Sequence, residues 1–295
     1  MEPAATTRLA SLIVLGTGVL WGLYWLPVRE LGGLGLGGAW GTAAITGAAA
    51  LLLAPMAWVR RSSLAAADPV ALASVALGGV AFMLYSVGFL YGRVALIVLL
   101  FFLTPVWSTI LGRVLMGWPT PRLRLAAIGL GLVGLVVMLG AGDGPPVPQG
   151  LGEWMGLASG LLWSVATTGM RARPPLGAAE GAFVFAGGAA LGALALAPLL
   201  SPLPAALALP ALAWAAAAGA LWWGLSIAAL TWASARLEPA RTGLLLMTEV
   251  LVSAVSAAVL AGEHLGPREM AGGALVLLAG VLEVWPVRRA RRVRS

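Results

Sequence analysis

Apolar runs of about 20 residues follow one another along almost the whole chain, separated by charged residues, glycine and proline. A run of this length can cross the hydrocarbon core of a bilayer as a helix, which satisfies its own backbone hydrogen bonds. Of the 295 residues, 60% are hydrophobic and only 10% are charged, whereas a soluble domain carries about 25% charged residues. The sequence therefore predicts an all-α membrane protein. We place ten transmembrane helices at 9–28, 38–59, 70–91, 94–116, 123–141, 151–170, 176–200, 211–234, 240–261 and 270–287.

Several residue types on which catalysis and metal binding depend are rare or missing. The chain has no cysteine and one histidine, His264, which excludes disulfides, thiolate metal sites and paired-histidine metal motifs. It also lacks a P-loop motif and any cluster of Ser, His, Asp or metal ligands at one depth in the membrane. We therefore expect no enzyme activity, no catalytic residue, no metal and no cofactor. An intramembrane enzyme is the unlikely reading from another functional class.

The positive charge follows the predicted topology. All 18 basic residues are arginines, and the formal net charge is +7. With ten spans, only Arg29, Arg93 and Arg268 fall on one side of the membrane. The others, including the tail from Arg288 to Arg294, fall at the opposite side. Because cytoplasmic loops carry an excess of Arg and Lys, we expect both termini in the cytoplasm. The charge reports topology, so no nucleic acid partner is expected.

The two halves of the chain resemble each other. Residues 1–141 form a first set of five spans, 142–150 a Gly/Pro linker, and 151–295 a second set with the basic tail. Gly18-Val-Leu-Trp21-Gly22 matches Gly160-Leu-Leu-Trp163-Ser164, and LFFLTPVWSTIL (100–111) matches LLLMTEVLVSAV (244–255). Because five is odd, the second half enters the membrane from the opposite side. Two inverted five-helix repeats are typical of transporters that work by alternating access.

Several short motifs carry a family resemblance. The Leu-Trp-Gly of the first span, the TPVW of the fourth and the GEHLGPRE (262–269) before the last resemble the EamA-type members of the drug/metabolite transporter superfamily. The many tryptophans and FMLYSVGFLYGRVA (82–95) are most similar to the bacterial aromatic amino-acid exporters of the YddG type. The resemblance implies a multi-pass protein of the bacterial inner membrane. One departure is that Glu249 precedes Val250 where the family often has Glu-Pro, so we expect a less kinked ninth span.

Side chains deep inside the spans are the candidates for a substrate site. A buried indole N–H needs a partner, so a tryptophan at mid-membrane favours a polar cavity, although ordinary helix packing explains it about as well. Thr104 and Trp107 share a helix face, and we expect Pro105 to open the backbone between them. The candidate substrate-binding residues are Trp21, Tyr24, Tyr85, Ser86, Thr104, Trp107, Trp163, Trp222, Trp223, Met247 and Glu249.

The charge of these candidates narrows the substrate class. No Lys or Arg lies deep in a span, so a phosphorylated substrate would be an unpaired dianion at midplane, which is costly. Aromatic faces attract an ammonium group by about 0.5–2 kcal/mol. We expect a secondary exporter of small amphipathic metabolites, with amino acids such as Phe, Trp, Tyr, Met and Thr as partners besides the lipid bilayer. The oligomeric state stays open, and a monomer is compatible with the sequence.

Glu249 is the one acidic residue at the centre of a span, and two roles remain open for it. Placing a carboxylate there costs about 2.5–3.5 kcal/mol, which favours a function such as binding a proton or a cationic substrate. The resemblance implies a structural hydrogen-bonding role instead, since family members of unlike substrate preference commonly have Glu here. An alternative function, a multidrug exporter on the same fold, would use Glu249 to anchor cations.

Overall fold

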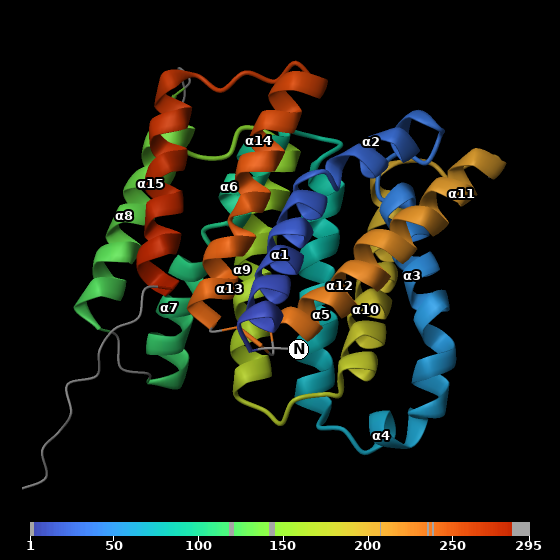
Figure 1. The fold of residues 1–295 in the computed structure, drawn as a ribbon. Helices are drawn as coiled ribbons and strands as arrows, with labels where there is room; N and C mark the ends of the chain where they lie inside the picture. The colour runs from blue at the N-terminus through green and yellow to red at the C-terminus, as the bar shows by residue number, and fades with distance from the viewer. Residues whose placement is uncertain are drawn as a thin grey trace, which may run out of the picture.

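The computed structural model of the protein describes residues 3–117, 121–141, 145–206, 208–234, 236–237 and 239–284. Within these ranges every regular element is helical and no strand occurs, and the helices form a bundle (Figure 1). The helices of residues 1–141 are α1 (Pro3–Gly22), α2 (Trp25–Gly33), α3 (Trp40–Val59), α4 (Arg61–Ala65), α5 (Pro69–Gly88), α6 (Val94–Phe101), α7 (Thr104–Met116) and α8 (Arg122–Leu139). Those after residue 150 are α9 (Leu151–Arg171), α10 (Ala178–Leu200), α11 (Leu209–Ala218), the π-helix η1 (Gly219–Leu225), α12 (Ser226–Ser234), α13 (Pro239–Leu246), α14 (Thr248–Leu260) and α15 (Pro267–Val284).

Helix length and composition identify a multi-pass membrane protein. In the described ranges, 8 segments are long and apolar enough to cross a membrane, the first of them Ala5–Gly33 across α1 and α2. The two remaining long helices, α9 and α15, run alongside these spans (Figure 1). Polar residues lower their hydropathy, because α15 carries Arg268, Glu269 and Glu283, and α9 contains several Ser and Thr. The all-α membrane fold is thus confirmed, whereas ten spans stays a prediction.

Helices from the two sequence halves interleave. The helix α5 packs between α9 and α10, α10 also packs along α3, α1 packs against α12 and α14, and α8 packs along α15. The helix α6 is apolar all round and buried along Val94–Leu100, as expected for a helix at the centre of a bundle. Large apolar side chains such as Leu51, Leu191 and Val259 are exposed on the outside, which suits a lipid surface.

Three of the long apolar segments are interrupted near their middle. One break lies at Leu23–Tyr24 between α1 and α2, a second at Phe102–Leu103 between α6 and α7, and a third at Met247 between α13 and α14. The expected opening between Thr104 and Trp107 is wrong, because α7 begins at Thr104 with Pro105 in its first turn. Proline is tolerated there because the first amides of a helix have no intrahelical acceptor. The break therefore precedes Thr104.

The ninth predicted span is broken although it lacks a proline. The expectation of a less kinked helix at Glu249 is therefore wrong. The break has the same local form as the one before Thr104. The hydroxyl of Thr248 donates to the Leu245 carbonyl at 2.7 Å, as that of Thr104 donates to the Phe101 carbonyl at 2.6 Å. A threonine can thus replace the intrahelical bond that a break removes.

The described arginines are divided between the two ends of the helix bundle. The described Arg29, Arg93 and Arg268 lie at one end of the bundle, which we call the arginine-poor end. The remaining described arginines lie at or near the other end, where α4 and the loop between α9 and α10 are found (Figure 1). We call it the arginine-rich end. The tail arginines lie outside the described residues, as do linker residues 142–144.

The arginine-poor end is tied across the two halves by ion pairs. Arg29 contacts the Glu263 carboxylate at 2.7 Å and donates to the Phe89 carbonyl at 2.9 Å. Arg93 pairs with Glu269, whose carboxylate also accepts the Gly266 amide at 2.8 Å. Burial raises the pKa of Glu269, but the hydrogen bonds from Arg93 and the Gly266 amide outweigh it, so this pKa lies below its ordinary value.

We expect the close approach of α10 to α5 to depend on Gly188. A Cβ added to Gly188 would lie 2.7 Å from the Ala76 Cα, whereas one added to Gly187 would have no described atom within 4 Å. Gly188→Ala should therefore lower the free energy of unfolding by about 1–3 kcal/mol through overpacking. Gly187→Ala should leave it unchanged or raise it, since alanine favours helix. Thermal unfolding in detergent measures both, and equal Tm values would contradict the packing described.

The Arg93–Glu269 pair predicts a pH dependence of stability. Because the pKa of Glu269 is lowered in the folded protein, its contribution is present above the ordinary glutamate pKa, about 4.3, and is lost as the pH falls through the lowered value. Glu269→Gln should lower the Tm at neutral pH and reduce the loss of Tm on acidification. The control is Glu30→Gln, an exposed carboxylate at the same end. Equal pH profiles for wild type and Glu269→Gln would exclude this role.

Candidate functional site

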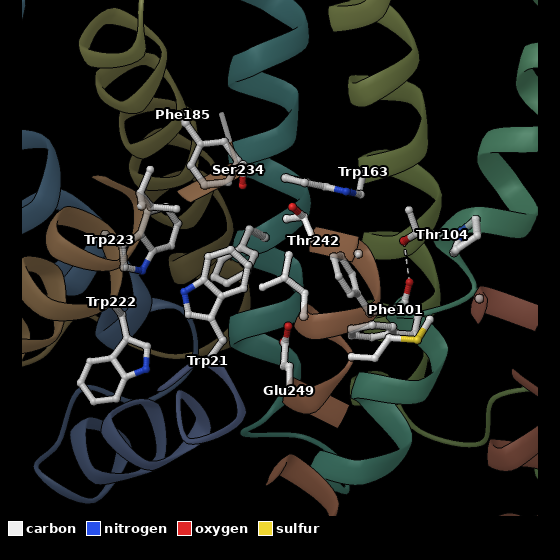
Figure 2. A pocket seen from close by; sticks show the side chains of 18 of the residues that line it. Trp21, Phe101, Thr104, Trp163, Phe185, Trp222, Trp223, Ser234, Thr242 and Glu249 are labelled. Carbon is white, nitrogen blue, oxygen red and sulfur yellow. Dashed lines mark hydrogen bonds between the residues drawn. The ribbon is translucent and has the colours of Figure 1, made fainter. Parts of the chain in front are cut away.

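A cavity of about 570 Å³ is lined by residues of both halves, among them Thr104 and Met247 at two of the helix breaks. Its wall is largely aromatic, and Figure 2 shows Trp21, Trp222 and Trp223 facing Phe101 and Thr104 across the space, with Glu249 between them. Such a volume falls in the range of pockets for small molecules, roughly 300–1,000 Å³. The aromatic lining residues are Trp21, Phe82, Phe101, Phe102, Trp163, Phe185, Trp222 and Trp223.

Seven of the eleven candidate residues line this cavity. They are Trp21, Thr104, Trp163, Trp222, Trp223, Met247 and Glu249. The other four do not line it: Tyr24, Tyr85 and Ser86 are buried, and Trp107 packs partly buried against the core. Whether any of them contacts a substrate stays a prediction, but the structure brings residues of both halves to one space.

The buried hydroxyls connect to the cavity lining by hydrogen bonds. Tyr85 donates to Glu249 Oε1 at 2.8 Å, Trp223 Nε1 donates to the Tyr24 hydroxyl at 3.1 Å, and Ser86 Oγ donates to the same hydroxyl at 3.2 Å. A satisfied buried network of this kind fixes side-chain positions. Tyr24, Tyr85 and Ser86 therefore orient the lining residues from behind.

The tryptophans differ in the partner of their indole N–H. Trp21 donates to Ser226 Oγ at 2.9 Å, and Trp222 donates to the Leu20 carbonyl at 2.6 Å. No described residue accepts a hydrogen bond from Trp163, although Trp163 lines the cavity. The N–H of Trp107 is buried and also has no described partner. The indole N–H of Trp163 is therefore without a partner within the described part of the chain.

The tryptophans of η1 depend on its unusual backbone. A π-helix adds a residue to the turn, and such bulges occur frequently at functional sites. Here η1 carries both Trp222 and Trp223, and both line the cavity. Successive residues of a regular α-helix point about 100° apart. The widened turn is therefore the local feature that accompanies two adjacent indoles in one wall.

The aromatic rings around the cavity form a continuous wall. Phe82 lies 5.2 Å from Trp223, centroid to centroid, at a nearly perpendicular angle, and Phe185 lies 5.4 Å from Trp223. Trp163 packs edge-on against Phe185 at 5.9 Å and lies 6.2 Å from Phe101. Edge-to-face contacts at these distances stabilise aromatic packing by about 0.5–1.5 kcal/mol. The wall is thus held by its own contacts.

Glu249 is the only acidic residue among the lining side chains of the described ranges. It lies buried in the first turn of α14, where the partial positive charge of a helix N-terminus favours a carboxylate. The break at Met247 creates this N-terminus in the middle of the bundle. The carboxylate thus has two supports, the start of α14 and the Tyr85 hydroxyl, and also borders the cavity.

Sequence reasoning missed several lining residues. Phe82 and Phe101 had weak signals, since Phe82 lies one turn before Tyr85 and Phe101 precedes the helix break. Phe185 has no local signal, since apolar neighbours surround it in α10. The remaining additions, Arg171, Ser234, Thr242 and a few apolar residues, extend the lining toward the arginine-rich end.

The cavity reaches the arginine-rich end. Its lining includes Arg171, an exposed residue in the last turn of α9. No residue of the ion pairs Arg29–Glu263 and Arg93–Glu269 is among the lining side chains. The lining of the described site thus extends to an exposed residue of the arginine-rich end, and the ion pairs of the arginine-poor end lie outside it.

Comparison with known proteins supports the fold and gives no function. No family model matches the chain, and no curated protein matches it. A solved structure, described only as the crystal structure of a protein, resembles this chain with a TM-score of 0.60 and 20% sequence identity, over 92% of this chain and 95% of that chain. At this identity the likeness concerns the fold alone.

Proposed function

We propose that this protein is a secondary transporter that exports small amphipathic metabolites, above all aromatic and other largely apolar amino acids, across the bacterial inner membrane. The observation that carries the proposal is the aromatic cavity, whose described lining includes the acidic Glu249 and extends to the exposed Arg171 at the arginine-rich end. Alternating access requires a binding site that faces one side of the membrane at a time.

The wall chemistry favours an amino acid with an apolar side chain. The rings of Phe82, Phe185 and Trp223 offer apolar surface to such a side chain. Glu249 and the ring faces attract an ammonium group, and the free N–H of Trp163 can donate to a carboxylate. These groups match the three parts of an aromatic amino acid.

The packing of the bundle supports two inverted repeats of five spans, with α9 and α15 as the sixth and tenth. Exchanging the halves pairs α1 with α9, α3 with α10, α5 with α11–η1–α12, α6–α7 with α13–α14, and α8 with α15. Under this exchange the contact of α5 with α9 becomes that of α12 with α1, and the contact of α10 with α5 becomes that of η1 with α3. Both exchanged contacts occur in the bundle.

The matching breaks before Thr104 and Thr248 add to this support. They lie at equivalent places of the fourth and ninth proposed spans, and each is bridged by a threonine hydroxyl. Half-helices that meet at mid-membrane are typical of transporter binding sites. An exchange of conformation between the two five-span repeats is a route to alternating access.

The arginine distribution supports an orientation with the arginine-rich end in the cytoplasm. In this orientation both termini are cytoplasmic, and the cavity accepts substrate from inside the cell. Export is the direction that this access favours.

A second candidate, an exporter of hydrophobic cations, is favoured by one observation, namely that Glu249 is the only acidic residue among the described lining residues. An aromatic wall with a single carboxylate also suits a cation without a carboxylate of its own.

A substrate panel in proteoliposomes tests the proposed function. Labelled Phe, Trp and Thr should show saturable transport, with and without a pH gradient, while a sugar phosphate should show none. Hydrophobic cations should compete weakly with Phe. Absence of transport of both Phe and Thr would contradict the proposal, and strong competition by cations would favour the second candidate.

Glu249→Gln tests whether the carboxylate binds the substrate ammonium. We expect the KM for Phe to rise about tenfold, since a hydrogen bond to a charged group contributes about 1.5–3 kcal/mol. Tyr85→Phe removes the buried donor to Glu249 but keeps the charge, so the KM should change less. If Glu249→Gln leaves the KM unchanged, the structural role of Glu249 is favoured. If Glu249→Gln has the same pH dependence of transport as the wild type, Glu249 is also excluded as a proton carrier.

A further inference from the structure

We propose that Arg171 binds the carboxylate of the substrate at the mouth of the cavity and thereby makes the site select amino acids over amines of the same shape. This inference rests on the proposed transport of amino acids and adds to it a specificity-determining residue.

The position of Arg171 follows from α9. Arg171 lies in the last turn of α9, and Trp163 lies eight residues earlier on the same helix, about 12 Å along its axis. Both residues line the cavity, so α9 carries an aromatic ring of the inner wall and a cation of the mouth. A substrate that enters from the arginine-rich end therefore meets Arg171 before it reaches Trp163.

Arg171 differs from neighbouring arginines in having no described partner. Arg173 lies 3.6 Å from the Asp68 carboxylate, and the guanidinium of Arg236 lies 4.0 Å from the Trp232 ring. Neither of these lines the cavity. No acidic side chain or ring in the described ranges pairs with Arg171. Its guanidinium is therefore available for an anionic group in the cavity.

Two hydroxyl side chains of the second half also line the cavity. Ser234 ends α12 and Thr242 lies in α13, and both line the cavity with Arg171. The Thr242 Oγ1 atom is buried and has no hydrogen-bond partner in the described part of the chain. A buried polar atom without a partner is costly, so a rotation of the Thr242 side chain toward a ligand oxygen would be favourable. The guanidinium of Arg171 is suited to a carboxylate, which it can bind through two parallel hydrogen bonds.

The two charges of the lining occupy different places. Glu249 lies at the break between α13 and α14, deep in the bundle, and Arg171 lies at the mouth. In an amino acid the ammonium and the carboxylate are adjacent. One molecule therefore cannot place its ammonium at Glu249 and its carboxylate at Arg171 at the same time. The carboxylate therefore engages Arg171 on entry, with the apolar side chain directed toward the aromatic wall, before the amino acid moves inward to Glu249 and Trp163. An amine without a carboxylate gains nothing at this point.

The test compares L-Phe with phenethylamine, which has the same ring and ammonium but no carboxylate. In proteoliposomes, the ratio of the inhibition constant of phenethylamine to the KM of Phe measures selectivity for the carboxylate. We expect Arg171→Gln to lower this ratio about tenfold by raising the KM of Phe. Arg171→Lys should give an intermediate ratio, because lysine keeps the charge but not the paired donors. Arg173→Gln, two residues away and outside the cavity, should leave the ratio at the wild-type value.

An unchanged ratio in Arg171→Gln would overturn the inference. This includes an equal loss for both ligands, which indicates a structural role. A ratio that falls equally in Arg173→Gln would also overturn it, since a general loss of positive charge would then explain selectivity. Failure of the proposed function is seen earlier and separately, as absence of Phe transport by the wild-type protein.

Discussion

The hydrogen bonds of the backbone are the constraint on which this structure depends. In a bilayer, an N–H or C=O without a partner costs several kcal/mol, so irregular backbone is tolerated only inside the protein or beside a cavity. The breaks before Thr104 and Thr248 lie in the interior, and threonine hydroxyls bond the adjacent carbonyls. Because of the break at Met247, α14 begins in the middle of the bundle, where its N-terminus stabilises Glu249. The acidic group of the site is therefore a consequence of how the helix was interrupted.

Behind the cavity, a buried layer of hydroxyl groups fixes the positions of side chains that line the cavity. Tyr24 accepts from Trp223 and Ser86, and Tyr85 donates to Glu249. These hydroxyls belong to the first half, with Tyr24 at the break between α1 and α2, while Trp223 and Glu249 belong to the second. A relative movement of the halves therefore changes the aromatic wall and the environment of the carboxylate together. This coupling of global movement to local chemistry is what a transporter of the proposed kind requires.

The sequence predicted the membrane fold well and the site partly. Apolar runs of bilayer length leave few alternatives to spanning helices, and Trp163 and Glu249 are conspicuous in the sequence because their neighbours are mostly apolar. Phe185 could not be identified, because a phenylalanine within an apolar helix has the same local pattern whether it lines a cavity or packs in the core. Trp107 was expected beside Thr104, but residues three apart share a face only approximately, and Trp107 packs against the core. Helix breaks were also unpredictable from proline alone, since the interruption at Met247 has none.

The ion pairs at the two ends differ in quality. At the arginine-poor end the Glu263 carboxylate is mostly buried and lies 2.7 Å from Arg29. At the arginine-rich end the distances are longer: 3.6 Å between Arg173 and Asp68, which are both partly exposed, and 3.9 Å between the exposed Arg60 and the buried Glu180. Exposed pairs contribute little to stability, typically about 0–1 kcal/mol, whereas separating a buried pair leaves a charge without its partner. Because the ion pairs of the arginine-poor end are shorter, we expect this end to be the harder of the two to open.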